Sequence, residues 1–87
     1  MIEQQPPCLL RAIQCANVLL AIDTSRRLID RFPTVKPKTK EHDELFEAVA
    51  ERMDFIQSLL PADIFNRFYY FESVETLEPD IVSYFAA

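Results

Sequence analysis

The stretch that decides the fold is CLLRAIQCANVLLAI, residues 8–22. Only Arg11, Gln14 and Asn17 interrupt its apolar residues, and at roughly 100° per residue of a helix these three fall on one narrow side. The remaining surface of the helix, well over half of its circumference, is apolar. Because an ordinary surface helix carries only one apolar stripe, we expect neighbours on two or three sides of this helix, at the centre of a small bundle or an oligomer.

The composition narrows the fold class. The 87-residue chain contains no glycine, which removes tight turns with positive φ, most β-hairpins and every glycine-rich phosphate-binding loop. A hydrophobic content of 49% is enough for a core and argues against intrinsic disorder. We therefore predict a single all-α domain, residues 1–87, with surplus apolar surface that favours a homodimer or a protein partner.

The pattern predicts a bundle of three to four helices with the first helix central. Their expected ranges are 7–32, 40–60, 62–75 and 79–86, after a flexible lead-in at residues 1–6. The first helix has an alternative break near 23–25, where Asp23 would cap a second, shorter helix.

Proline and capping residues set the expected boundaries between these helices. Residues 33–39 form a Pro/Lys linker, in which Pro33 and Pro37 hold the chain extended. Thr39 is the expected N-cap of the second helix, and Pro79 is expected at the start of the last one.

The second helix has the clearest periodicity. Its expected core seam repeats at four- and three-residue steps and consists of His42, Phe46, Val49, Met53, Ile56 and Leu60. This spacing also suits a coiled coil, but Leu45, Ala50 and Leu59 flank the seam and widen it into the stripe of a globular bundle helix. His42 is expected at the end of the helix, half covered by a neighbour.

An aromatic run marks the third helix. Phe68-Tyr69-Tyr70-Phe71 is aromatic enough for a strand over 65–71, but a lone strand would have no partner, so we predict a helix. These rings cannot all face one side, and exposed Tyr and Phe are typical of binding surfaces. The predicted protein-binding residues are Phe65, Phe68, Tyr69 and Tyr70, together with the acidic face of the second helix, Glu44, Glu47, Glu51 and Asp54.

Charge is distributed unevenly. Residues 1–40 hold seven Lys/Arg and three Asp/Glu, a balance of +4, whereas residues 41–87 hold two and eleven, a balance of −9. The simplest interpretation is mutual attraction of the two halves across an antiparallel hairpin. A functional alternative is a basic cluster that binds an acidic partner, made of Arg26, Arg27, Arg31, Lys36, Lys38 and Lys40.

Catalysis, metal binding and membrane insertion have no support in the residue pattern. One histidine and two cysteines cannot form a closed zinc site, so we expect no metal and no cofactor. Cys8 and Cys15 lie about 10.5 Å apart on one helix, beyond the reach of a disulfide, which predicts reduced, core-facing thiols in the cytoplasm. No stretch reaches the roughly 18 apolar residues of a membrane span, and no secretory signal is visible.

The sequence therefore predicts a non-enzymatic helical module that binds a protein partner, as an adaptor, an inhibitor or a chaperone-like subunit. The alternative is a charge-based regulator of nucleic-acid machinery, which acts as an acidic phosphate mimic or through the Arg26–Lys40 cluster. Direct nucleic-acid binding is disfavoured, because a net charge of −5 has the wrong sign for neutralising phosphates.

Overall fold

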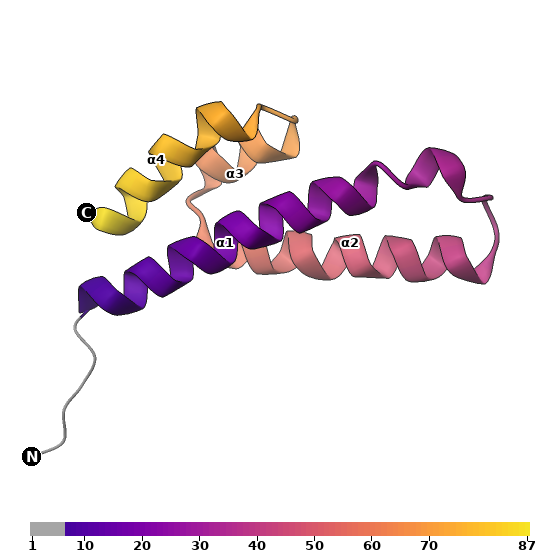
Figure 1. Cartoon of the computed structure of the whole chain (residues 1–87), viewed down its shortest axis with the longest axis horizontal. Helices are drawn as coiled ribbons and strands as arrows, with labels where there is room; N and C mark the ends of the chain where they lie inside the picture. Colours follow the sequence, from indigo (N-terminus) through magenta and orange to yellow (C-terminus); the bar gives the residue numbers. More distant parts are fainter. Residues whose placement is uncertain (1–6) are drawn as a thin grey trace, which may run out of the picture.

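The computed structural model describes residues 7–87, with side chains from Leu9 onward. The elements in this range are α1 (Pro7–Ile29), the 3-10 helix η1 (Phe32–Thr34), α2 (Lys40–Leu59), α3 (Ala62–Tyr69) and α4 (Val74–Ala86) (Figure 1). Residues 7–87 contain no strand, so the all-α prediction is confirmed and the strand alternative at 65–71 is wrong. The alternative break near 23–25 is also wrong, because α1 is continuous there. The expected lead-in, residues 1–6, lies outside the described residues.

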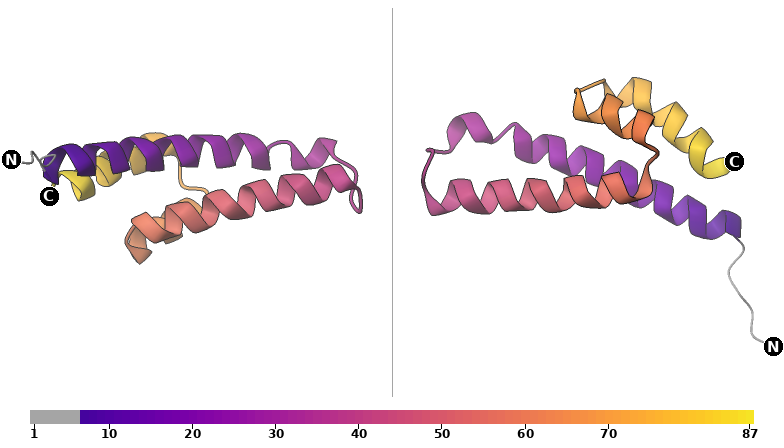
Figure 2. Two further views of the ribbon diagram at one scale, coloured as in Figure 1. Left: turned by 90° about the horizontal axis from the view of Figure 1, so that it is seen from below. Right: turned by 180° about the vertical axis from the view of Figure 1, so that it is seen from behind.

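Helix α1 is the central element, as predicted. It packs against α2 and against α4. Helix α2 runs back antiparallel to the second half of α1, while α3 and α4 fold back so that α4 lies along the first half (Figure 1). The other two views show the same arrangement (Figure 2). Since α2 ends near the middle of α1, the two halves of α1 have different neighbours.

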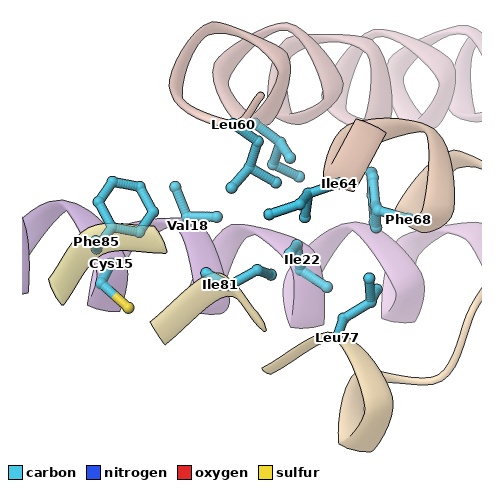
Figure 3. Close-up of a cluster of buried hydrophobic side chains, with 10 residues drawn as sticks. Cys15, Val18, Ile22, Leu60, Ile64, Phe68, Leu77, Ile81 and Phe85 are labelled. Atoms are coloured by element: carbon cyan, nitrogen blue, oxygen red, sulfur yellow. The ribbon is translucent and has the colours of Figure 1, made fainter. Parts of the chain in front are cut away.

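The core lies where α1, α2 and α4 meet. Figure 3 shows Cys15, Val18 and Ile22 of α1 beside side chains of the other helices. Helix α4 contributes Leu77, Ile81 and Phe85, and the α2–α3 segment contributes Ile56, Leu60, Ile64 and Phe68. The spacing of 15, 18 and 22 on α1 and of 77, 81 and 85 on α4 places one stripe of each helix in this core.

The first helix and its linker differ from the predicted boundaries. Helix α1 ends at Ile29 rather than at residue 32, because Pro33 has no N–H to donate to the carbonyl of Ile29 and its ring clashes with that group. The linker is not simply extended, since Pro33 lies in the turn η1. The predicted N-cap is confirmed, because the Thr39 hydroxyl accepts a hydrogen bond from the backbone N–H of His42 at 3.2 Å.

The third and fourth helices also differ from their predicted ranges. Helix α3 ends at Tyr69 rather than at 75, and α4 begins at Val74 rather than at 79, with Ser73 as its N-cap. Pro79 therefore lies inside α4, where it interrupts a backbone hydrogen bond. Burial of apolar side chains offsets the loss of this hydrogen bond, because Leu77 and Ile81, which flank the proline, are both fully buried.

Helix α1 is rotated about its axis relative to the orientation in which its polar side would face solvent. Its polar side, which includes Arg11 and Gln14, does not simply face water, since both residues are only half exposed. Arg11 reaches the last turn of α4, where Nε donates to the carbonyl of Phe85 at 2.8 Å and Nη2 donates to that of Tyr84 at 2.7 Å. These carbonyls have no partner within their own helix, and a cation there also suits the helix dipole. The rotation exposes an apolar side of α1.

The core seam of α2 is shifted as well. Leu45, which the sequence places beside the seam, is buried, whereas Phe46 is 62% exposed. His42 is half covered as expected, and its ring meets that of Phe32 edge-on at 5.3 Å. The shift follows from the position of α1, because the stripe that faces α1 passes through Leu45 and Ile56.

The packing of α4 can be tested with two neighbouring residues. We expect Ile81→Ala to lower the free energy of unfolding by about 2–4 kcal/mol, because it leaves a cavity in the core. Val82→Ala should change this free energy by less than about 0.5 kcal/mol, since Val82 is exposed. Urea unfolding followed by circular dichroism measures both. Equal losses for the two variants would contradict the assignment of Ile81 to the core.

Candidate protein-binding surface

An apolar hollow on the described surface lies beside the end of α3. It has a volume of about 460 Å³, and we call it the aromatic groove; its lining residues are Ile29, Met53, Phe68, Tyr69, Tyr70 and Phe71. Phe68 is buried in the core, whereas Tyr69, Tyr70 and Phe71 are 53%, 78% and 64% exposed. Three consecutive aromatic side chains therefore stand in solvent around an apolar floor.

The backbone at the end of α3 explains why these rings are exposed. The N–H of Glu72 donates to the carbonyl of Arg67 at 3.0 Å, and the N–H of Phe71 donates to that of Phe68 at 3.0 Å. This is a Schellman motif, whose C′ position adopts a left-handed conformation and is usually glycine. Phe71 occupies that position with φ of 64°. A left-handed non-glycine residue costs about 1–2 kcal/mol, and it turns the aromatic side chain outward.

The absence of glycine did not prevent left-handed backbone, contrary to the simplest expectation. Lys38 in the linker and Phe71 both have positive φ. Lys38 is a loop residue, whereas Phe71 combines the same conformation with a large exposed ring. Backbone strain of this kind is concentrated at functional positions.

Arg26 of α1 contacts two of the rings that line the aromatic groove. Its guanidinium carbon lies 5.2 Å from the ring centroid of Phe68 and 5.9 Å from that of Phe71. Its Nη2 donates to the carbonyl of Phe68 at 3.2 Å, while its buried Nε has no partner. Burial lowers the pKa of Arg26. Cation–π contact with both rings therefore fixes Phe71 relative to α1.

An ionic cluster ties the turn after α3 to α4. Arg67 of α3 binds the carboxylate of Glu72, and its Nη1 lies 2.7 Å from Oδ2 of Asp80 in α4. Residues 67 and 72 are the positions that carry a hydrophobic contact in many Schellman motifs, so an ion pair takes its place here. The hydrogen bond from Arg67 lowers the pKa of Glu72.

The structure separates the sequence-predicted aromatic residues into two groups. Tyr69 and Tyr70 are exposed at the groove, whereas Phe68 belongs to the core and contributes only to the floor. Phe65 is half buried, with ring centroids 6.0 Å from Phe68 and 6.2 Å from Tyr69. Phe71 was not among the predicted binding residues. The sequence did contain a signal for Phe71: a helix commonly ends with a left-handed glycine, and this chain has no glycine to take that position after the third helix.

The predicted acidic face is present on α2. Glu44, Glu47, Glu51 and Asp54 are all exposed. Glu44 lies 3.7 Å from Lys40, and among residues 9–87 the other three make no salt bridge. The carboxylates of Glu47, Glu51 and Asp54 therefore remain available to an external cation.

The predicted basic cluster is largely engaged within the chain. Arg26 binds the end of α3, and Arg27 pairs with Asp23 at 3.1 Å. Arg31 lies 3.7 Å from Glu41, and Lys40 pairs with Glu44. Lys36 and Lys38 are exposed in the linker. Only the Arg31–Glu41 pair joins the two halves of the hairpin, because Arg27–Asp23 and Lys40–Glu44 are i,i+4 pairs within α1 and within α2.

The described residues give little support for metal binding, thiol chemistry or membrane insertion. Within this range no group of three or more His, Cys, Asp or Glu side chains could hold a metal ion. Cys15 is free and buried, and burial, followed by the nearby charge of Glu78, raises the pKa of its thiol. The side chain of Cys8 lies outside the described ones. Among helices α1 to α4, none combines the length and hydrophobicity that crossing a bilayer requires.

The Arg67–Glu72 pair predicts a pH dependence. Because the pKa of Glu72 is lower in the folded state than in the unfolded chain, the pair stabilises the fold above the ordinary pKa of 4.5. This stabilisation is lost as the pH falls through the lowered pKa. Glu72→Gln should therefore make the fall of Tm between about pH 5 and pH 2 shallower than in the unmodified chain. The control is Glu47→Gln, which should keep the original profile; parallel profiles for all three proteins would contradict the pairing.

Comparison with known proteins does not assign a relationship. No model of a protein family matches the chain, no curated protein is detectably similar to it, and no solved structure matches its fold at a significant level. Its function therefore has to be inferred from the residues themselves.

Proposed function

We propose that this chain is a non-enzymatic interaction module that binds a protein partner through the aromatic groove. In this role it would serve as an adaptor, an inhibitor or a chaperone-like subunit. The observation that carries the proposal is the exposure of Tyr69, Tyr70 and Phe71 around an apolar floor. Aromatic side chains that fill or surround a desolvated pocket dominate the binding energy of many interfaces.

The left-handed Phe71 adds a second argument. A glycine at this position would form the same turn without steric cost. The chain instead holds a large ring there, 64% exposed and braced by Arg26. Contact with a partner would explain the presence of the ring, because burial in an interface removes its apolar area from water, which is favourable.

The acidic face of α2 supports a role of charge in the choice of partner. Its unpaired carboxylates would attract a basic protein surface and repel an acidic one. The alternative role, regulation of nucleic-acid machinery by phosphate mimicry, would use the same carboxylates. The engagement of Arg26, Arg27, Arg31 and Lys40 within the chain gives the basic cluster less support as a binding site.

Two substitutions at the groove test the proposal. Tyr70→Ser and Phe71→Gly should each weaken capture of a partner from the native cell by about tenfold or more, as expected for aromatic hot spots. Capture by the immobilised chain, followed by quantitative mass spectrometry, measures the effect. Val82→Ser is the matched control, since Val82 is an exposed apolar residue outside the groove.

Stability measurements on the same variants separate binding from folding. Phe71→Gly removes cation–π contact but also removes the left-handed strain, so its free energy of unfolding should change by less than about 1 kcal/mol. A variant that captures the same proteins as the unmodified chain, at the same level, would show that the groove is not the binding site.

A further inference from the structure

The aromatic groove is assembled from three separate parts of the chain. Ile29 comes from α1 and Met53 comes from α2, whereas the aromatic side chains come from α3 and the turn that follows it. Figure 1 places the end of α3 beside the second half of α1. The shape of the groove is therefore determined by how the end of α3 is held against the α1–α2 hairpin.

A single residue makes the polar contact between these parts. Among the described residues, the one hydrogen bond from α1 or α2 to residues 62–73 runs from Nη2 of Arg26 to the carbonyl of Phe68, at 3.2 Å. No salt bridge within the described range joins α1 or α2 to residues 62–73 either. Arg67, the other cation at the end of α3, contacts Glu72 and Asp80 instead.

The guanidinium of Arg26 is used inside the chain. It lies over the rings of Phe68 and Phe71, with its carbon 5.2 Å and 5.9 Å from their centroids. Within residues 9–87 it pairs with no carboxylate, whereas its neighbour Arg27 pairs with Asp23. Arg26 is only partly exposed and does not line the groove. Its position suits it to hold the rings rather than to meet a partner.

Phe71 depends on this contact more than the other exposed rings do. Tyr69 and Tyr70 meet each other edge-on, with centroids 5.3 Å apart, but in the described part of the chain no aromatic ring packs on Phe71. The hydrogen bonds of the Schellman motif fix its left-handed backbone and leave rotation about its side-chain bonds free. The cation–π contact with Arg26 is therefore what orients the ring.

We infer that Arg26 is the positioning residue of the aromatic groove. It holds the ring of Phe71 and the end of α3 in the arrangement that a partner binds, without contacting that partner. The inference rests on the proposed function, since it concerns the same groove, and it adds a residue of α1 on which the affinity of the groove depends. Without Arg26, the ring of Phe71 would be ordered only on binding, and ordering a side chain at an interface lowers affinity.

The first test needs no partner. A para-fluorophenylalanine incorporated at position 71 of the full chain reports the surroundings of this ring by fluorine NMR. Arg26→Met should move the resonance toward its position in the urea-unfolded chain, because the ring loses the guanidinium that orients it. Arg27→Met is the matched control, since it removes an exposed guanidinium one residue away, and it should leave the resonance unchanged.

Stability measurements separate positioning from folding. The Nε of Arg26 is buried without a partner, so Arg26→Met removes an unsatisfied donor along with the hydrogen bond to Phe68. Its Tm, followed by circular dichroism, should therefore change by less than about 6 °C. Arg26→Gln is a second variant with the same expected resonance shift. Ile81→Val lowers stability in the core without changing a residue that lines the groove, and it should leave the fluorine resonance in place.

The second test measures affinity. The probe is the set of proteins that the unmodified chain captures from the native cell, quantified by mass spectrometry. Arg26→Met should weaken this capture by about threefold to tenfold, the effect of ordering a side chain on binding. Tyr70→Ser, which removes a ring of the groove itself, should weaken it by about tenfold or more. Arg27→Met should capture the same proteins at the original level.

Two results would overturn the inference. An unchanged fluorine resonance in the Arg26→Met chain would show that the turn alone orients Phe71. Capture that Tyr70→Ser abolishes and Arg26→Met leaves intact would show that the affinity of the groove does not depend on Arg26. Equal capture by the Tyr70→Ser chain and the unmodified chain would instead overturn the proposed function, while the fluorine resonance still decides whether Arg26 positions the ring.

Discussion

The burial of one stripe of α1 between two other helices is the constraint on which the structure depends. Val18 and Ile22 are completely inaccessible to solvent, as are Ile56 of α2 and the pair Leu77 and Ile81 of α4. Each helix has only one side in this core, so the buried stripe of α1 is fully covered only when both α2 and α4 are in place. The exposed rings of the aromatic groove follow from this constraint, because side chains that cannot enter the shared core remain outside it.

Two arginines of α1 hold the ends of the C-terminal helices in place. Arg11 donates to carbonyls in the last turn of α4, and Arg26 donates to a carbonyl in the last turn of α3. Each guanidinium also lies over aromatic rings of the helix that it contacts. Hydrogen bonds from a charged donor are stronger than those between neutral groups. Two charged residues of α1 therefore orient its neighbours.

The use of these arginines inside the structure explains which features could be predicted from the sequence and which could not. The helical class, the central position of α1 and the Thr39 cap depend on local pattern and were predicted. The orientation of α1 was not, because the contact between Arg11 and Phe85 joins residues far apart in the sequence. An arginine on an apolar helix is ordinarily expected in solvent, and only the position of α4 shows that this one is used internally.

The boundaries of α3 and α4 were missed for a related reason. Proline normally marks a helix start, so Pro79 indicated the wrong boundary, while burial of Leu77 and Ile81 determined the true one. The Schellman turn could not be predicted from the sequence, because Phe71 rather than glycine occupies its left-handed position. The exposed Tyr69 and Tyr70 could be anticipated from composition, but the groove beside them required Ile29 and Met53 from two other helices.

The pairing of α1 with α4 also has a consequence for the order of folding. The α1–α2 hairpin can form from neighbouring segments, but its core remains open until α4 arrives from the far end of the described chain. During synthesis on the ribosome, Val18 and Ile22 would stay partly solvated while α4 is still inside the exit tunnel. A hairpin of α1 and α2 without α4 therefore exposes apolar side chains that chaperones and proteases recognise, until α4 docks.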